Sequence, residues 1–229
     1  MYSSYDASSV VSARAAAKTI GAAAIAAKGT ANEAVLITSY EEGRSVFGED
    51  AAGTQGMSTL LGMLFLNGAG AVKAAAVGKA AGGAADYASA FAALSEEEDV
   101  GIVVCDSAEV SVHQSLKTSV ENASNARRER IAVVGGAAET VAQMVEHAKS
   151  INSERMVLVG PDAVLEDGTE ASAVLAAAAA AGVIAGSSDA SVPINGAALA
   201  GLGAVSRQWS DSEIDQLVRG GVTPIECVG

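Results

Sequence analysis

The chain has 229 residues, of which 50% are hydrophobic and 18% are charged, so it suits one domain with an arm and excludes wholesale disorder. Its net charge of −13 repels phosphate backbones and anionic lipid, so neither nucleic acid nor a membrane is an expected partner. Alanine supplies roughly a fifth of the residues and aromatics only 3%, so the core must rest on closely approaching backbones.

Residues 1–27 are small and polar at first and then rich in alanine, and large apolar side chains arrive only with Ile20 and Ile25. Such a stretch buries too little apolar surface to fold by itself. We therefore predict an extended N-terminal arm over residues 1–27, ordered against a neighbouring subunit, and an α/β domain over residues 28–229.

The first predicted elements of the domain are a short strand at Val35–Ile37 and a helix that begins after Thr38 or Ser39. These two residues are candidate N-caps because two glutamates follow in the first turn. Gly48 ends this helix. The spacing of apolar residues predicts a second helix over Met57–Leu66, which stops before a glycine.

Four continuously apolar runs then alternate with segments of helical period, the pattern of a parallel sheet covered on both faces. The predicted strands are Val72–Val77, Val100–Cys105, Ile131–Val134 and Met156–Val159. The predicted helices between them are Ala84–Leu94, Glu109–Val120 and Glu139–Ile151. We expect an α/β fold with a mostly parallel, doubly wound sheet and helices on both faces.

The last third contains an alanine-rich predicted helix, Ala171–Ala185, which is too short and too weakly apolar to cross a membrane. A loop over 186–195 follows it. A capping box formed by Ser210 and Glu213 opens a helix at Asp211–Arg219, and a final strand is predicted at Val222–Val228. The start of the chain lacks the pattern of a signal peptide, so we expect a soluble protein made in the cytoplasm.

Glycine-rich turns do not form a nucleotide site in this sequence. Gly135-Gly136 follows a strand but lacks the third glycine of a dinucleotide fingerprint, and Gly78-Lys79 does not complete a phosphate-binding loop. We interpret both as turns and assign no cofactor and no cofactor-binding residues.

Candidate catalytic and metal-binding residues are equally isolated. His113 and His147 fall within predicted helices as surface or packing residues, and Cys105-Asp106 ends a strand without a histidine partner. Glu109 and His113 share a helix face, but two ligands do not make a metal site. We therefore predict no catalytic and no metal-binding residues.

Other polar groups are read as structural or solvated. Cys105 and Cys227 are expected to be free, buried thiols, and the loop Asp162–Glu170 lacks the alternating carboxylates of a calcium site. The run Glu96–Asp99 is expected to be solvated. The basic run Arg127–Arg130 is interrupted by a glutamate and has no aromatic neighbour, so it does not predict nucleic-acid binding.

Several segments, taken in order, resemble contractile phage tail sheath proteins. The matching segments are Leu36–Glu42 with Phe47-Gly48, Leu60–Leu66, the Gly-Ala-Gly turn into Ala71–Val77, Ala181–Gly186, Ser191–Gly196, and Ser212–Asp215 with Gly220–Glu226. Members of that family continue into a C-terminal domain and an arm, whereas this sequence stops at Gly229 and lacks the usual Gly-Val-Tyr arm opening. The resemblance covers the N-terminal region and the central α/β domain.

The resemblance implies a structural subunit that assembles helically around an inner tail tube and contracts to drive injection, without a cofactor or active site. It implies further copies of itself, the tube protein, and baseplate and tail terminator proteins as partners. It also implies a place in the tail of a virion or a phage-tail-like particle. Residues 1–27 and Val222–Val228 are then expected to contact neighbouring subunits. The alternative is a small-molecule or nucleotide-binding α/β enzyme of unknown chemistry.

Overall fold

The computed structural model of the chain describes residues 18–78, 82–137, 140–187 and 193–227. Its centre is a seven-stranded sheet in the order β10-β6-β5-β4-β1-β3-β2, in which every neighbouring pair is parallel except β2 with β3. The strands are β1 (Thr19–Ile25), β2 (Ala34–Ile37), β3 (Val72–Val77), β4 (Val100–Cys105), β5 (Ile131–Gly135), β6 (Met156–Gly160) and β10 (Val222–Pro224).

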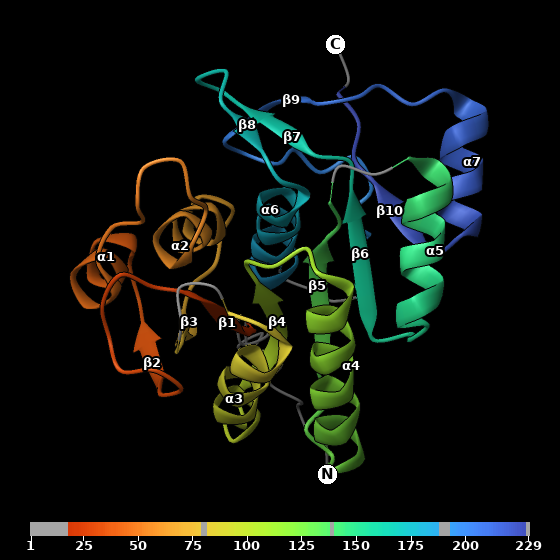
Figure 1. Cartoon of the computed structure of the whole chain (residues 1–229). Coiled ribbons are helices and arrows are strands. Elements are labelled where there is room, and N and C mark those ends of the chain that lie inside the picture. The colour runs from red at the N-terminus through yellow and green to blue at the C-terminus, as the bar shows by residue number, and fades with distance from the viewer. Residues whose placement is uncertain (1–17, 79–81, 138–139, 188–192, 228–229) are drawn as a thin grey trace, which may run out of the picture.

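Helices cover both faces of this sheet (Figure 1). One face packs against α1 (Tyr40–Phe47), α2 (Met57–Leu66) and α6 (Ala173–Gly186). The other packs against α3 (Ala84–Ser95), α4 (Val110–Asn125), α5 (Val141–Ile151) and α7 (Asp211–Arg219). Each face has its own apolar core, so the predicted doubly wound α/β architecture is confirmed.

The first strand corrects the prediction of an arm over residues 1–27. Thr19–Ile25 forms β1, which lies between β3 and β4 in the middle of the sheet, whereas residues 1–17 lie outside the described residues. The stretch was missed because Thr-Ile-Gly-Ala-Ala-Ala-Ile has few of the large β-branched and aromatic residues that mark strands. Its small side chains are instead suited to burial on both faces.

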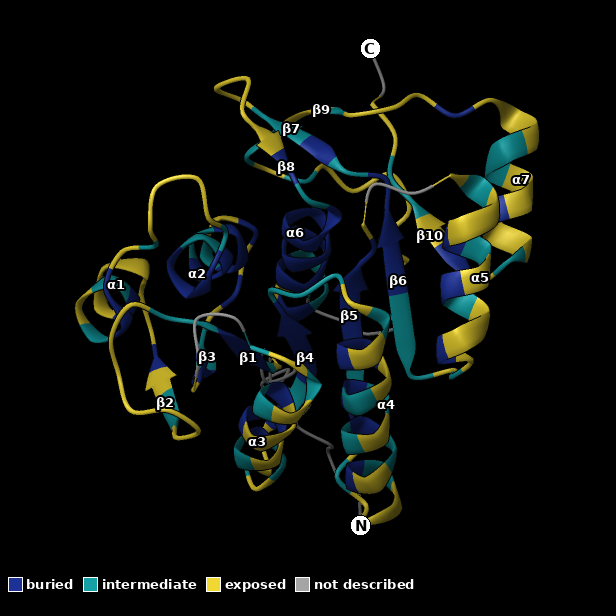
Figure 2. Cartoon of the chain, in the orientation of Figure 1, coloured by how far each residue is buried: buried dark blue, intermediate teal, exposed yellow. Residues whose placement is uncertain are grey.

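Alanine is concentrated where the backbones approach most closely. β1 and β3 lie in parallel register with Ala22, Ala23 and Ala24 beside Ala74, Ala75 and Ala76. On the same face α6 lies over β5, β6 and β4 and packs beside α2, which contacts β1, and eleven of the fourteen residues of α6 are buried. Figure 2 shows α6 dark along its length, whereas α4, α5 and α7 have exposed outer sides. The alanine excess therefore builds a central helix with no solvent face.

Glycines complete this close packing. A Cβ at Gly135, which ends β5, would lie 2.1 Å from backbone atoms of Ala173 and Val174 at the start of α6. A Cβ at Gly182 would lie 2.8 Å from the Leu64 carbonyl oxygen of α2. Because these neighbours are backbone atoms, any side chain at either position would push α6 away from the sheet or from α2.

The predicted elements differ from the structure mainly in length. The helix predicted over Glu109–Val120 continues to Asn125 with Glu109 as its N-cap, and the alanine-rich helix begins two residues later than predicted. The last strand stops at Pro224, and Val228 lies outside the described residues. Ser39 is the N-cap of α1, since its hydroxyl accepts a hydrogen bond from the Glu42 N–H at 3.2 Å.

A second, three-stranded sheet was not predicted. It consists of β7 (Ala163–Leu165), β8 (Glu170–Ala171) and β9 (Leu202–Val205), all antiparallel. These strands have two to four residues each, too few for an alternating pattern to be recognised. In Figure 1 this sheet lies beyond one end of α6, and α6 contacts β7.

Candidate functional site

The carboxyl end of the sheet between β1 and β4 is where doubly wound folds usually bind ligands, because the chain leaves β1 toward β3 and leaves β4 toward β5, in opposite directions along the sheet. In this protein Asp106 occupies that position. Its Oδ2 accepts a hydrogen bond from the Ile25 N–H at 2.8 Å, and its Oδ1 accepts one from the Tyr87 hydroxyl. The carboxylate thus ties together β1, β4 and α3.

Burial, with a smaller contribution from the nearby Asp50 carboxylate, raises the pKa of Asp106 to about 6, although the two hydrogen bonds act in the opposite direction. Asp50 itself is engaged at the start of α2, where it accepts hydrogen bonds from the N–H groups of Gly56, Ser58 and Thr59. Both carboxylates therefore accept hydrogen bonds from backbone N–H groups. Among the described residues no cluster of three or more metal-ligating side chains is arranged to hold a metal ion.

Cys105, next to Asp106, is buried, and burial raises the pKa of its thiol to about 12. The thiol donates only to the Ser107 carbonyl, at 3.6 Å. A thiol that stays protonated and covered cannot act as a nucleophile. Both cysteines are free, as expected, but Cys227 is exposed, so the prediction that both are buried is wrong for Cys227.

His113 and His147 were predicted to be separate surface or packing residues, but the fold brings them together between α4 and α5. Both are buried, their rings stack with centroids 5.0 Å apart, and Nδ1 of His113 lies 2.9 Å from Nε2 of His147. Burial lowers the pKa of His113 to about 4. Glu109 is exposed at the N-cap of α4, whereas His113 is buried. Glu109 and His113 therefore do not form the shared metal-binding face considered from the sequence.

The basic run supports α3 from its C-terminal end. Arg130 is 3% exposed and donates to the carbonyl oxygens of Leu94 at 3.0 Å and Glu97 at 2.9 Å. Arg128 donates to the Ser95 carbonyl at 2.5 Å. These carbonyls lie at or just beyond the C-terminus of α3, where that of Leu94 also accepts the Glu97 N–H at 3.2 Å, so the two arginines have a structural role at this helix end.

The acidic run Glu96–Asp99 was expected to be solvated, but two of its side chains form ion pairs within the fold. Glu97 and Asp99 each lie 2.5 Å from Nζ of Lys73 on β3, and Asp99 also accepts from the Thr19 hydroxyl of β1 at 3.1 Å. The Lys73 ammonium, through its hydrogen bond, is the largest cause that lowers the pKa of Asp99. This cluster joins three strands at the amino end of the sheet.

The remaining motifs have structural positions. Gly135 permits the contact with α6 described above, Lys79 lies outside the described residues, and Asp162 accepts from the Ala173 N–H at 2.8 Å where α6 begins. Asp167 accepts from the Thr169 N–H in the turn between β7 and β8. Within the described ranges no helix has both the length and the hydropathy that a membrane crossing requires.

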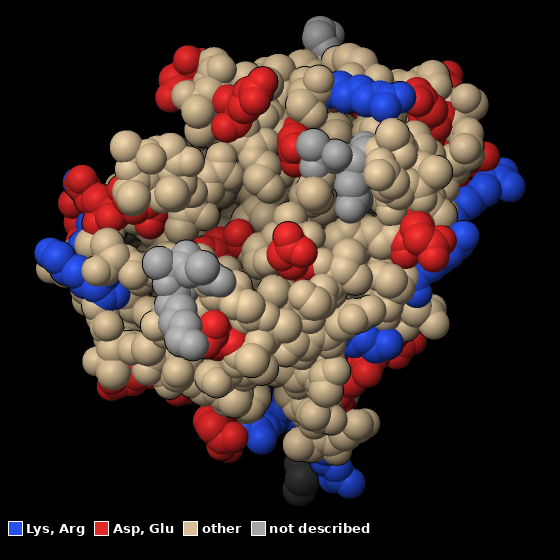
Figure 3. Space-filling view, viewed as in Figure 1, with Lys and Arg blue, Asp and Glu red and all other residues tan. Residues whose placement is uncertain are grey.

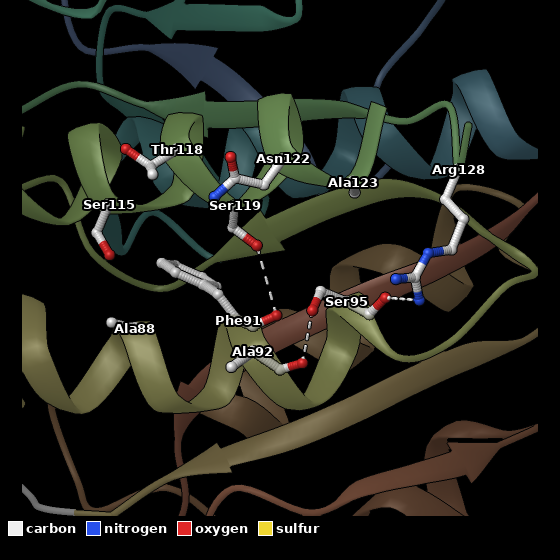
Figure 4. A pocket seen from close by; sticks show the side chains of 10 residues that line it. All are labelled: Ala88, Phe91, Ala92, Ser95, Ser115, Thr118, Ser119, Asn122, Ala123 and Arg128. Carbon is white, nitrogen blue, oxygen red and sulfur yellow. Dashed lines mark hydrogen bonds between the residues drawn. The ribbon is translucent and has the colours of Figure 1, made fainter. Parts of the chain in front are cut away.

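A groove of about 390 Å³ runs between α3 and α4 (Figure 4). It is lined by Ala88, Phe91, Ala92, Ser95, Ser115, Thr118, Ser119, Asn122, Ala123 and Arg128. The one charged side chain in this lining, Arg128, turns toward Ser95, and no acid or base stands opposite it (Figure 4). The lining thus offers no acid–base pair for catalysis.

The two outer strands of the large sheet present free edges. β2 at one edge carries Leu36, which is 51% exposed, and β10 lies at the other. Ile225 donates its N–H to the Gly160 carbonyl of β6 at 2.8 Å, so the alternation of a strand turns the nitrogen of Pro224 to the open side. A proline at this position blunts the edge, because it has no N–H to offer.

The surface charges are spread rather than collected. On the face seen in Figure 3, acidic and basic side chains are scattered among uncharged residues, and no continuous basic patch is visible. With neither a catalytic constellation nor a ligand pocket among the features described, the strand edges and the outer helices are the candidate functional surfaces.

Comparison with known families shows which class of protein this chain belongs to. The model of the phage tail sheath protein central domain matches residues 80–229. The chain belongs to the phage tail sheath family. Comparison with curated protein sequences gives no match. The predicted resemblance to sheath proteins is confirmed, and residues 80–229 match the central domain of that family; the alternative of an enzyme gains no support from the comparisons.

Solved sheath structures share the fold. A sheath tail protein from Desulfitobacterium hafniense superposes with a TM-score of 0.70 at 12% identity, over 92% of this chain and 68% of that one. A sheath tail protein from Listeria innocua gives 0.66 at 14% identity, over 91% and 65%. The helical sheath of the anti-feeding prophage in its contracted state gives 0.65 at 15% identity, over 100% and 64%. This chain therefore spans about two thirds of the length of the sheath structures it matches.

Proposed function

We propose that this chain is the repeating subunit of a contractile sheath, which assembles as a helix of identical copies around an inner tail tube and shortens to drive injection. The sheath-family match over residues 80–229 carries the proposal. Similarity of fold to a helical sheath and to a baseplate assembly of the anti-feeding prophage supports it. Partners then include further copies, the tube, the baseplate and the tail terminator, in a virion or phage-tail-like particle.

The free edges suit this role. Repeated head-to-tail contacts between identical subunits generate open helices, and an edge strand can accept a strand from a neighbour through its backbone groups. We place such contacts at β2 and β10, and at residues 1–17, the part of the proposed arm that does not belong to β1. The energy for contraction would reside in these contacts, so the proposal requires neither catalysis nor a cofactor.

The test is assembly of the chain with and without a blocked edge. Glu226 is an exposed residue two positions beyond the end of β10, and its backbone N–H would face the open side if the alternation set by the Ile225–Gly160 hydrogen bond continues. Glu226→Pro removes this donor, and Glu226→Ala is the matched control that changes the side chain alone. We expect rings or tube segments by negative-stain microscopy for the unmodified chain and for Glu226→Ala, and fewer for Glu226→Pro.

Sedimentation velocity of the same three samples gives the assembled fraction, and circular dichroism confirms that they share one fold. Assembly of Glu226→Pro at the level of Glu226→Ala would remove the β10 edge from the proposal. A chain that stays monomeric at every concentration, alone and with the tube protein of its own particle, would refute the sheath role.

A further inference from the structure

The pair His113 and His147 is a polar contact in an otherwise apolar layer. The first residue lies on α4 and the second on α5, and their side chains meet among buried residues of the core that faces α3, α4, α5 and α7. Exposure is 0% for His113 and 3% for His147. The imidazole–imidazole contact is a side-chain hydrogen bond between α4 and α5 in which both partners are buried.

The surroundings of His113 fix where its protons lie. Its Nε2 is 2.8 Å from the Ser107 carbonyl oxygen, which can only accept, so Nε2 must carry a proton. The neutral ring then has a bare Nδ1, which accepts a hydrogen bond from the Nε2–H of His147 at 2.9 Å. The contact between the two rings thus holds a single proton.

A second proton cannot be accommodated in this geometry. If both facing nitrogens carry protons, two N–H groups point at one another, and two positive rings lie with centroids 5.0 Å apart in a buried layer. Either the rings separate or one of them stays neutral. Separation would move α5 away from α4.

Among the residues that the structure describes, the charged groups named here on the surrounding elements have other partners or lie at the surface. Lys117 on α4 points its Nζ toward the Asn152 carbonyl, Glu146 pairs with Lys149 on α5, and Asp215 pairs with Arg219 on α7. Glu109 is exposed at the start of α4, Asp106 is bound to Tyr87 and Ile25, and Asp86 lies in the first turn of α3. Burial, the Ser107 carbonyl and His147 are the causes that set the pKa of His113.

We propose that His113 and His147 form an acid-sensitive latch that holds α4 against α5 at neutral pH and releases α5 when both rings are protonated. The observations that carry it are the burial of both rings, the short contact between them and the carbonyl that dictates its polarity. Release would uncover the apolar surface of β6 and β10 beneath α5. The latch is independent of the sheath role, because it concerns one chain.

Amide hydrogen exchange of the full chain between pH 7.5 and 4 tests the latch, with each rate corrected for its intrinsic pH dependence. We expect α5 amides to lose protection at least tenfold as the pH falls from 7 to 4.5, whereas α1 and α2 stay protected. The fluorescence of Trp209, the chain's single tryptophan, which packs in the same core, should shift to the red in step.

His147→Gln is the decisive variant, because a glutamine side chain can place a donor near the position of Nε2 and cannot be protonated. We expect it to lose less α5 protection by pH 4.5 than the unmodified chain, because only the burial of His113 then opposes protonation of that ring. Glu146→Gln, which removes a neighbouring exposed charge, should behave like the unmodified chain. Equal acid profiles for the unmodified chain and His147→Gln would overturn the proposal, as would full protection of α5 in the unmodified chain at pH 4.

Proton NMR of the imidazoles in the unmodified chain keeps the test open if His147→Gln does not fold. The latch predicts that the second protonation of the pair coincides with the loss of α5 protection. Protonation of both rings while α5 remains protected would refute it.

Discussion

At the scale of single residues, the buried polar groups of this protein hold backbone segments in place. Asp106 joins two strands and a helix, and Arg130 binds carbonyls at the end of α3. Each satisfies main-chain groups that would otherwise be buried without partners, which is costly. In an enzyme with this fold, the position of Asp106 would face a ligand; here it closes the crevice.

Asp106→Asn should stabilise the protein at neutral pH. The folded-state pKa of Asp106 is about 6 against an ordinary 3.8, so its ionisation weakens the fold as the pH rises from 3.8 to 6. An amide avoids that charge: its oxygen accepts from Ile25 and its NH₂ donates to the Tyr87 oxygen. We expect a gain of up to about 2 kcal/mol at pH 7 that vanishes below pH 4.

Urea unfolding at pH 7 and at pH 4 measures this gain. Tyr87→Phe is the companion variant, because it removes one partner from the carboxylate, and it should lose about 1–3 kcal/mol at pH 7. A loss of stability for Asp106→Asn at pH 7 would mean that the charge itself is required.

His113 should make the fold weaker in acid, in the opposite sense to Asp106. Its folded-state pKa is about 4 against an ordinary 6.5, so between these values the unfolded chain takes up the proton first and stability falls as the pH falls. The two windows overlap, so their effects oppose one another in the unmodified chain. Asp106→Asn should therefore show a steeper acid loss than the unmodified chain in urea titrations from pH 6.5 to 4.

Arg130→Met should cost about 2–4 kcal/mol of unfolding free energy, because it leaves the Leu94 and Glu97 carbonyls without their buried donor. Thermal or urea unfolding measures the loss. Arg127→Asn is the matched control: Arg127 is exposed with a φ of 63°, a conformation that asparagine tolerates, so its effect should stay within about 0.5 kcal/mol. Equal losses for the two would contradict the capping role of Arg130.

At the scale of elements, α6 depends on backbone approach. Gly135→Ala places a Cβ 2.1 Å from backbone atoms of Ala173 and Val174, so α6 must move and loses contact along its length. We expect a loss above about 3 kcal/mol, or failure to fold. Gly83→Ala is the control, since its Cβ would meet nothing within 4 Å, and it should cost no more than about 1 kcal/mol, the loss expected when alanine replaces glycine at the N-cap of α3.

Melting temperatures of Gly135→Ala and Gly83→Ala decide this point. If both variants melt at the temperature of the unmodified chain, α6 tolerates a side chain at position 135, and the prediction that Gly135 is required for its packing is wrong.

The elements also show what sequence reasoning can reach. The strands Val72–Val77 and Val100–Cys105 were predicted with their observed bounds, because continuous apolar runs between helical segments are a strong local signal. β1 was missed, since its alanines are informative only beside those of β3 and α6. The contact of His113 with His147 was missed for the same reason: it joins residues that are distant in sequence, and no local pattern marks it.

At the scale of the whole molecule, the net charge of −13 opposes assembly of identical copies. Salt screens such repulsion, so we expect the assembled fraction to rise between 20 and 200 mM NaCl. Light scattering at a fixed protein concentration measures it, with sucrose of equal osmolality as the control. An assembled fraction that falls with salt would indicate that attractive ion pairs between copies outweigh the repulsion.

The place of α6 in the chain order bears on how the protein folds during synthesis. β1, β3, β4, β5 and β6 all leave the ribosome before Ala173–Gly186, so the sheet face that α6 covers stays open to water until late. Exposed apolar surface on such an intermediate invites aggregation. Alanine carries little apolar area per residue, so the alanines of α6 and of β1 and β3 (Ala22, Ala24, Ala74 and Ala76) expose less apolar surface on the intermediate than leucine and valine would. Small side chains thus protect the unfinished protein as well as pack the finished one.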